Sequence, residues 1–223
     1  MNTHIHDAAT LVLWRAQPGG YAVLMGQRAA AAIFMPGKFV FPGGRVDPSD
    51  AAVPLHAPLA PACLQRLSVS ADVRQGNELA VAAIRELWEE TGLMIGGEAY
   101  ACDGVNLPET WRNFVETGHL PDVSQLKLFF RAITPPNRPR RFDARFFIAP
   151  ASAVVGDLDD FSGADLELSH LQWVPLAAAS ELDLPFITQI VLAELSAYLN
   201  APDVPRPVPF FDNRSDTPRF LTL

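Results

Sequence analysis

Hydrophobic positions along the chain follow two periods, which separate the expected strands from the expected helices. Residues 8–14 and 21–27 are apolar and strand-like, and the turn residues Gln17, Pro18, Gly19 and Gly20 between them predict a β-hairpin. A short third strand is expected at residues 38–41. Later strands are expected at residues 125–133, 141–148 and 168–174.

The strongest helical pattern covers residues 77–91. Asn77 is a candidate N-cap, and Gly92 stands where glycine commonly ends a helix. A helical wheel places Ala80, Ile84, Leu87 and Trp88 on one side and Glu86, Glu89 and Glu90 on another. We therefore expect an amphipathic helix that packs its apolar side and presents its glutamates. A second helix is expected at residues 185–199.

Residues 47–76 differ in composition, being rich in Ala, Pro and Ser, and their prolines exclude a long helix before Pro61. We interpret about 48–76 as an insertion, with a short helix near Leu64, in a single domain of residues 1–200. Residues 201–223 are expected to be an extended tail packing on this domain. The mixture of strands and helices predicts an α+β or α/β sandwich around a mixed sheet.

Composition and charge limit the kinds of binding partner that we expect for this chain. The 223-residue chain is 49% hydrophobic, which is enough for a core, and it lacks a long apolar run or a signal peptide. Its two cysteines, Cys63 and Cys102, favour reduced thiols in a cytoplasmic protein. A net charge of −8 disfavours nucleic acid and anionic membranes as partners. An anionic small-molecule substrate would need a cation to mediate binding. A homodimer is compatible with the sequence.

Three carboxylates lie on one helical turn and a half, at Glu86, Glu89 and Glu90. Like charges at this spacing repel by roughly 0.2–0.5 kcal/mol per pair on an exposed helix. A divalent cation would convert the repulsion into affinity, and oxygen ligands suit Mg²⁺ shared with substrate phosphates. Such an ion would lower the pKa of a water molecule that attacks phosphorus while a carboxylate takes the proton. Arg85, one turn before Glu89, can hold that carboxylate in position.

Gly44, followed after an interval by Arg85-Glu86-Leu87-x-Glu89-Glu90-x-Gly92-Leu93, resembles the Nudix box, a glycine-opened loop leading into a metal-binding helix. The resemblance implies a Nudix-type α/β/α sandwich and a metal-dependent diphosphatase. It implies that Glu86, Glu89 and Glu90 bind Mg²⁺ or Mn²⁺ with a backbone carbonyl of Gly44 or Gly43. The general base would be Glu86 or a carboxylate from a later loop, for which Glu167 is the candidate.

The first half of the box departs from the family pattern. Six positions after Gly44, with five residues between, the family has Glu where this chain has Asp50. The arginine expected at position 58 occurs at 85, which is 27 residues later. A similar interruption occurs in Nudix proteins that resemble the peroxisomal coenzyme A diphosphatases. Asp50, Asn77 or Glu78 could fill the role of the missing box glutamate.

A motif of coenzyme A hydrolysing Nudix enzymes has a similar spacing to residues 24–29, Gly37 and residues 41–44. The match is partial, because Ile33 replaces the motif's internal arginine and Met25-Gly26 replaces its Leu-Thr. The resemblance implies substrate contacts from Arg28 and Gly43, with coenzyme A or an acyl derivative as the first choice of substrate. ADP-ribose, NADH or a dinucleotide is the alternative.

Two further groups of residues have a functional and a structural interpretation. Five arginines could bind phosphates, with Arg145 the candidate, or form a solvent-exposed hairpin face, which is favoured. They are Arg131, Arg138, Arg140, Arg141 and Arg145. Phe146 or Phe147 could stack on adenine, although such aromatics usually fill a core. The acids before residue 168, apart from Glu167, are expected in an exposed loop.

Two other functions compete with hydrolysis. The domain could sense a nucleotide without cleaving it, but a sensor has no need of three mutually repelling glutamates. Alternatively, the Glu-rich helix could be structural and the box match coincidental, in which case divalent cations would not stabilise the fold.

Overall fold

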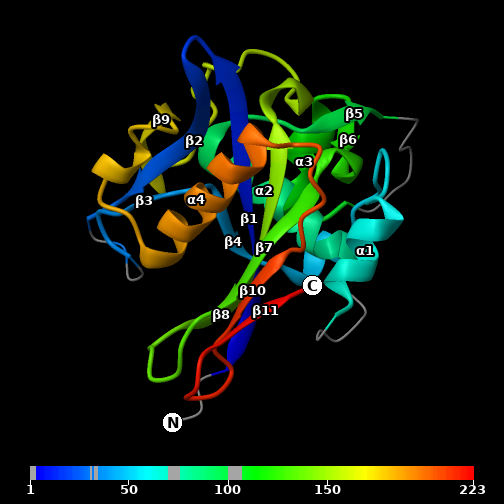
Figure 1. Ribbon diagram of the computed structural model, residues 1–223. Coiled ribbons are helices and arrows are strands. Elements are labelled where there is room, and N and C mark those ends of the chain that lie inside the picture. The colour runs from blue at the N-terminus through cyan, green and yellow to red at the C-terminus, as the bar shows by residue number, and fades with distance from the viewer. Residues whose placement is uncertain (1–3, 31, 33–34, 70–75, 100–106) are drawn as a thin grey trace.

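The computed structural model describes residues 4–30, 32, 35–69, 76–99 and 107–223. Its centre is a nine-stranded mixed sheet with helices on both faces, which confirms the expected α+β sandwich (Figure 1). The main path through the sheet runs β11-β10-β7-β8-β1-β2-β3, while β4 pairs with β1 and β9 pairs with β2. Its strands are β1 Ile5–Gln17, β2 Gly20–Arg28, β3 Phe39–Val40, β4 Gly43–Arg45, β7 Lys127–Ile133, β8 Arg141–Pro150, β9 Leu168–Pro175, β10 Pro209–Asp212 and β11 Arg219–Thr222.

The predicted hairpin forms from β1 and β2, with Gly19 and Gly20 at positive φ in its turn. β1 also pairs in parallel with β8, from Ile5 opposite Arg141 to Trp14 opposite Pro150, and this pairing makes the sheet mixed. Two short strands, β5 Gly96–Glu98 and β6 His119–Pro121, form a separate antiparallel pair. The helices are α1 Pro61–Leu67, α2 Gly76–Thr91, α3 Glu109–Glu116 and α4 Phe186–Asn200.

Two hydrophobic clusters cover the two faces of the sheet. On one face, residues of α2 such as Ile84 and Leu87 pack with Leu11 and Phe147 of the sheet. The other cluster joins α4 to the opposite face, where Leu195 contributes a fully buried side chain. Because α2 lies directly on the central strand β1, its glutamates Glu86 and Glu90 are held against β4, the neighbour of β1.

The predicted helix at residues 77–91 is correct in its body and in its end, but not in its start. α2 begins at Gly76, so Asn77 lies inside the helix, and its Oδ1 accepts from the backbone N–H of Leu59, 3.2 Å away. Asn77 therefore ties the insertion to the helix instead of capping it. At the other end, Gly92 has a φ of +76° and donates to the carbonyl of Trp88, as expected for a C-terminal glycine.

The insertion contains more local structure than the sequence indicated. The short helix expected near Leu64 is α1, and a 3₁₀ turn at Pro48–Ala52 precedes it. Asp47 caps this turn by accepting from Ser49 N, while Asp50 accepts from the N–H of Asp47, so both ends of a capping box are present. Residues 70–75 of the insertion lie outside the described residues.

The C-terminal residues extend the sheet. β10 pairs in parallel with β7, β11 pairs with β10, and Phe210 is fully buried between them and the rest of the fold. In Figure 1 these two strands run beside β7 and β8 at the lower edge of the molecule. Leu223 and Val208 exchange backbone hydrogen bonds, so the last residue is held against the start of the segment.

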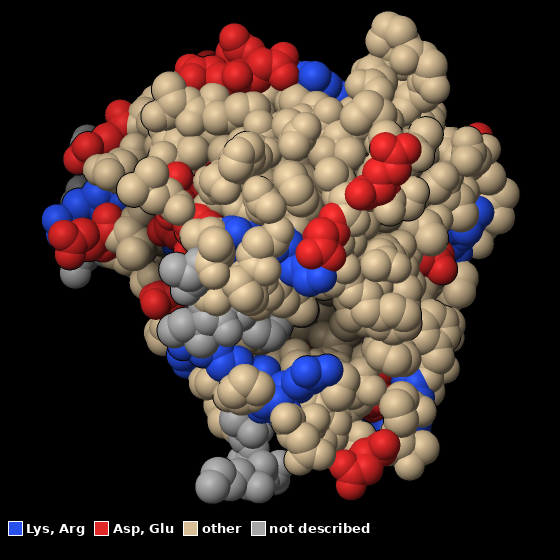
Figure 2. Space-filling view, turned by 90° about the vertical axis from the view of Figure 1, so that its left-hand side faces the viewer, with Lys and Arg blue, Asp and Glu red and all other residues tan. Residues whose placement is uncertain are grey.

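Two observations describe the molecule from outside. None of the helices in the described ranges has the length and hydrophobicity needed to cross a bilayer. On the side that carries β3 and β9, the surface is hollowed near its centre, with basic side chains below the hollow and acidic side chains spread more widely (Figure 2).

Candidate active site

Arg85 is the buried centre of the candidate site. Its Nε donates to Asp50 Oδ1 at 2.9 Å, and its Nη2 donates to Asp50 Oδ2 and to the carbonyl of Arg45. Its Nη1 donates to Glu86 Oε1 at 2.8 Å and to Glu89 Oε2 at 2.9 Å. All five donors of the guanidinium are therefore used, and the expected contact between Arg85 and Glu89 is present.

Asp50 takes the position that the sequence left open among three residues. Its carboxylate is 1% exposed and accepts from Arg85, from Asp47 N and from the indole Nε1 of Trp111 at 3.2 Å. Of the other two candidates, Asn77 contacts the insertion and does not contact Arg85 in any described interaction. The 3₁₀ turn brings Asp50 to Arg85, so the shorter acid reaches a partner 35 residues away.

Trp111 is the contact that the sequence reasoning missed. This residue of α3 is fully buried, and its indole nitrogen donates to Asp50. A buried carboxylate that pairs with arginine still needs hydrogen-bond donors for its remaining lone pairs. The proline after Asp47 and the acid three residues later mark a capped turn, but no local pattern points from there to Trp111.

Glu90 and Glu86 face the glycines of β4. The backbone N–H of Gly43 donates to Glu90 Oε2 at 2.8 Å, while Glu90 Oε1 is buried without a hydrogen-bond partner among the described residues. A Cβ added to Gly44 would lie 2.4 Å from Glu86 Oε1. Gly44 therefore leaves the space that the Glu86 carboxylate occupies, which is a physical reason for glycine at this position.

A late loop brings Glu167 to the same place. Gly163 packs against Gly92 at the end of α2, and the N–H of Asp165 donates to the carbonyl of Glu89 at 2.8 Å. From this anchored loop, Glu167 forms an ion pair with Arg28 Nη2 at 2.7 Å. The loop itself is exposed, as expected, with Asp157 and Asp160 accepting from backbone N–H groups two residues on.

Burial and crowding change the ionisation of these acids. Burial raises the pKa of Glu86 to about 7 against the lowering effect of Arg85, and the charges of Glu89 and Glu167 raise it further. Burial, together with Glu86 and Glu167, holds the pKa of Glu90 well above its usual range. Burial also raises the pKa of Glu89. The site concentrates negative charge that the protein itself neutralises only in part.

The residues fit a divalent cation. As they stand in the described part of the chain, no three His, Cys, Asp or Glu side chains form a closed set of metal ligands. The unpartnered Oε1 of Glu90 and the raised pKa values of Glu86 and Glu90 are what a carboxylate site shows when the compensating charge is supplied from outside. Carboxylate and carbonyl oxygens are the donors that Mg²⁺ and Mn²⁺ prefer.

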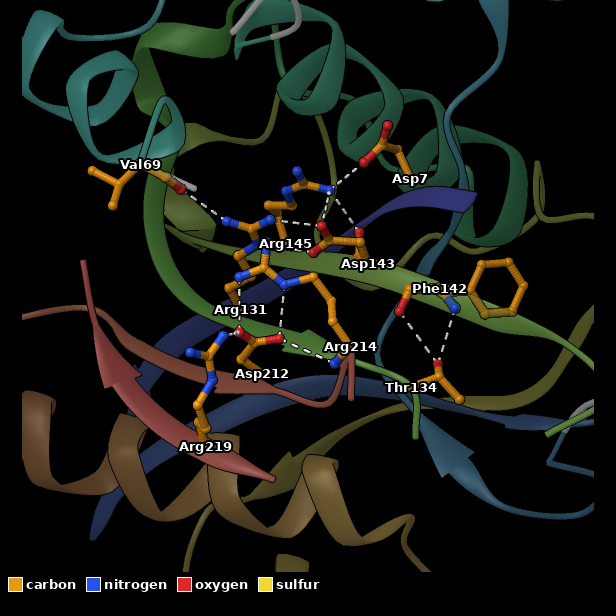
Figure 3. A network of polar contacts seen from close by, with 10 residues as sticks. All are labelled: Asp7, Val69, Arg131, Thr134, Phe142, Asp143, Arg145, Asp212, Arg214 and Arg219. Carbon is orange, nitrogen blue, oxygen red and sulfur yellow. Dashed lines mark hydrogen bonds and ion pairs between the residues drawn. The ribbon is translucent and has the colours of Figure 1, made fainter. Parts of the chain in front are cut away.

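The arginines between β7 and β8 divide into two groups. Arg131, Arg141 and Arg145 are at most 4% exposed, so the favoured expectation of a solvent-exposed face is wrong for these three. Arg131 and Arg145 form ion pairs with Asp143, and Arg145 also pairs with Asp7 (Figure 3). The other two, Arg138 and Arg140, are exposed as expected.

Arg145 and Phe146, two predicted substrate contacts, are already committed to the fold. Arg145 lies two strands from Gly44 through the pairings of β8 with β1 and β1 with β4, but its guanidinium contacts acids of the protein. Phe146 is 8% exposed and packs edge-to-face on Phe130 at a ring distance of 5.9 Å, and Phe147 is fully buried. Ile33 and Cys102 lie outside the described residues.

Comparison with known proteins gives consistent matches. The NUDIX domain family matches residues 4–195. "Putative nudix hydrolase 7" of Caenorhabditis elegans is 29% identical over 164 residues, or 68% of this chain and 46% of the relative, so the matched part spans about half of that protein. The crystal structure of a NUDIX hydrolase from Alicyclobacillus acidocaldarius has a TM-score of 0.68 at 29% identity, covering 91% of this chain and 96% of that one. The NUDIX domain of Shewanella oneidensis NrtR, complexed with ADP ribose, shares only the fold, with a TM-score of 0.50 at 13% identity over 88% of this chain and 90% of that one.

Proposed function

This chain belongs to the NUDIX family, and on that premise we propose that it hydrolyses the diphosphate bond of a nucleoside diphosphate linked to another moiety, using Mg²⁺ or Mn²⁺. The observation that carries the proposal is the placement of Glu86 and Glu90 against the glycines of β4, where Glu90 Oε1 is buried and has no hydrogen-bond partner in the described part of the chain. A structural helix would gain nothing from this arrangement, because crowded buried acids destabilise a fold unless a cation compensates them.

The proposed roles follow from the positions of the side chains. Glu86, Glu89 and Glu90 would hold the ion, with a backbone oxygen of Gly44 as a further donor. When bound, a divalent ion would supply positive charge to the diphosphate and lower the pKa of a water molecule. Arg85 keeps Glu86 and Glu89 side by side, because one nitrogen donates to both carboxylates.

Glu167 is the proposed proton acceptor. It comes from a different element than the three helical glutamates, and its carboxylate is 51% exposed, so a water molecule can reach it. As water adds to phosphorus, Glu167 takes the proton, the anhydride P–O bond breaks, and the second phosphate leaves with the electron pair. Glu86 stays the alternative base. Mn²⁺ binding and kcat of Glu167→Gln and Glu86→Gln distinguish a base from a metal ligand, because only the loss of a metal ligand weakens Mn²⁺ binding.

Coenzyme A or an acyl derivative is the proposed first substrate. Its support is the motif resemblance, together with the way that the motif residues converge. Gly37 N donates to Arg28 O at 3.1 Å, Gln27 Nε2 donates to Gly37 O at 2.9 Å, and Gly43 contacts Glu90. ADP-ribose, NADH and diadenosine polyphosphates are the alternative substrates of the same chemistry.

A substrate panel tests the proposal. Each compound is incubated with the protein and Mg²⁺ or Mn²⁺, and the two phosphorylated products of its cleavage are separated and quantified. We expect release of both products from coenzyme A or acyl-coenzyme A at the highest kcat/KM. If Mn²⁺ binds but no compound of the panel is cleaved, the proposed substrate class is wrong and oxidised nucleoside triphosphates become the next class to assay.

Matched variants test the site. Glu89→Gln should lower kcat by roughly two orders of magnitude or more, because it removes one carboxylate of the proposed metal site. Its folding should be unaffected, since the change also relieves repulsion within the helix. Glu116→Gln, an exposed glutamate on α3, is the control and should retain full activity. An unchanged rate in Glu89→Gln would place the activity elsewhere.

A further inference from the structure

Arg28 lies at the end of β2, where β9 begins. In the antiparallel pairing of β2 with β9, Arg28 stands directly opposite Leu168, so Glu167 is the first residue beyond the last pair. The ion pair between Arg28 Nη2 and Glu167 Oε1, at 2.7 Å, therefore closes the end of this ladder. The two residues are 139 positions apart in the sequence, and only the strand pairing brings them together.

A bulge sets the register that makes this meeting possible. The β2–β9 pairing shifts between Met25 and Gln27, and a Cβ added to Gly26 would lie 2.9 Å from Leu168 Cβ. Gly26 thus leaves the space that the side chains of Leu168 and Leu171 occupy, two residues before Arg28. Bulges of this kind redirect the side chains that follow them and are frequent next to active sites.

Glu167 needs a cation to stay where it is. Its charge acts on both Glu86 and Glu90, and like charges in a partly desolvated site repel. Arg85 cannot serve Glu167, because all its donors are used by other acceptors. Arg28 is the cation whose charge acts on Glu90 and whose side chain contacts Glu167.

Resting on the proposed function, we infer that Arg28 is a positioning residue, which holds Glu167 beside Glu86 and Glu90 and does not itself contact the substrate. The orientation of its guanidinium supports this role. Nε is buried away from solvent, and Nη2 donates to the carboxylate, so the group is directed at Glu167. This reassigns the arginine that the motif resemblance placed among the substrate contacts.

The chain offers a matched control in a second arginine–carboxylate pair. Arg15 on β1 contacts Asp159 at 2.9 Å, and Asp159 belongs to the same late loop as Glu167. Both pairs tie the β1–β2 hairpin to this loop, and both carboxylates are more than half exposed. Arg15 and Asp159 are not among the charges that mainly affect Glu86 or Glu90.

A double-mutant cycle tests the inference on the panel substrate that the wild type cleaves fastest. Arg28→Met and Glu167→Gln should each lower kcat by about tenfold or more with KM changed little. If Arg28 acts through Glu167, adding Arg28→Met to Glu167→Gln should change kcat by less than about twofold. Arg28→Lys, which keeps the charge but not the planar fork, should recover part of the rate. Arg15→Met should leave kcat unchanged, both in the wild type and when added to Glu167→Gln.

Hydrogen exchange of the metal-free protein provides a readout without turnover. The N–H of Glu167 donates to Asp165 Oδ1 at 2.8 Å, so exchange in residues 163–168 reports on the order of the loop. Arg28→Met should accelerate exchange in this segment, whereas Arg15→Met should act on residues 157–160. If Arg28→Met accelerated exchange equally in all parts of the protein, Arg28 would only stabilise the fold. Arg28→Lys then decides between the two roles, because a positioning role requires that kcat and the slow exchange of residues 163–168 recover together.

Two results would overturn the inference. Effects of Arg28→Met and Glu167→Gln that multiply in kcat/KM, with KM raised by the arginine change, would show that Arg28 contacts the substrate directly. Unchanged exchange in residues 163–168 would show that Glu167 does not depend on Arg28. Different results would contradict the proposed function, namely a wild-type protein that cleaves no compound of the panel or a Glu89→Gln variant with full activity.

Discussion

At the scale of single residues, the site depends on how each acid is neutralised. Asp50 is buried and paired with Arg85, and every acceptor that it offers is used. Glu90 is as buried as Asp50 but has one oxygen with no partner within the described residues. The contrast separates a carboxylate that organises the protein from one that is proposed to bind a cation. Only the tertiary structure makes this distinction, because in the sequence both residues are simply acids in or near the box.

Asp50→Asn tests the organising role. The change keeps the shape but leaves Arg85 without its buried counter-charge, so the free energy of unfolding should fall by about 3 kcal/mol. The rate should also fall, because Arg85 then no longer fixes Glu86 and Glu89. Chemical denaturation and kcat measure both effects. Asp122→Asn, in a half-buried aspartate that caps another 3₁₀ turn, is the control and should change neither. A wild-type melting curve for Asp50→Asn would contradict the assignment.

At the scale of elements, the site is the place where β4, α2 and the late loop meet. β4 pairs with β1, on which α2 packs, so the glycines of β4 face the glutamates of α2 at close range. The two adjacent glycines meet different neighbours. Gly43 lies against the backbone of β1, whereas Gly44 lies against the carboxylate of Glu86.

Alanine at these two positions should therefore separate stability from activity. In Gly43→Ala the new Cβ would lie 2.6 Å from Ala9 O and 2.7 Å from Thr10 Cα, which are backbone atoms that cannot move freely. We expect a loss of about 1–3 kcal/mol in unfolding free energy. In Gly44→Ala the Glu86 side chain can swing aside, so the fold should survive while kcat falls about 100-fold. Thermal melting and turnover of both variants check this, and the reverse pattern would refute it.

At the scale of the whole molecule, the last residues complete the sheet. β10 and β11 cover the edge of β7, and the guanidinium groups of Arg131 and Arg214 lie over the ring of Phe210, at 4.3 and 5.8 Å from its centroid. Asp212 is buried beneath Arg214 and Arg219, which lower the pKa of its carboxyl group (Figure 3). The segment is thus part of the structure that supports β7 and β8.

Phe210→Ala tests how much the fold depends on this segment. Phe210 is fully buried, so we expect the free energy of unfolding to drop by about 3–5 kcal/mol. Phe220→Ala, on the neighbouring strand with a side chain 60% exposed, is the matched control and should cost little. Denaturant unfolding of both variants measures the difference. Equal effects would mean that the C-terminal strands are only loosely attached.

The response to pH and metal is also a property of the whole molecule. The pKa of Glu86 is about 7 in the folded chain against 4.5 as its ordinary value, so ionising it opposes folding. The contribution of Glu86 to the free energy of unfolding is therefore complete below pH 4.5 and is lost as the pH rises through 7. The difference is roughly 3 kcal/mol. Mg²⁺ binds the ionised form, so the rise in Tm on adding Mg²⁺ should be larger at pH 8 than at pH 5.5. An equal rise at both values, or one that persists in Glu86→Gln, would contradict this.

The sequence by itself determined the elements and the chemical type of the site. The hairpin, the long helix with its terminal Gly92 and the cluster Glu86, Glu89 and Glu90 follow from local periodicity and from spacing on a helix. The insertion was also visible, because proline and alanine change the composition there. All these features depend on residues close to one another along the chain.

Only the tertiary structure decided which distant residues meet. Asp50 reaches Arg85 across the insertion, Glu167 reaches Arg28 through a strand pairing, and Arg145 turns inward to Asp7. Local patterns cannot choose among several acids of equal propensity, because the partner of a buried charge is set by strand register and by which face a side chain takes. Burial and pairing, and not residue type, distinguish the acids that support this fold from those proposed to act.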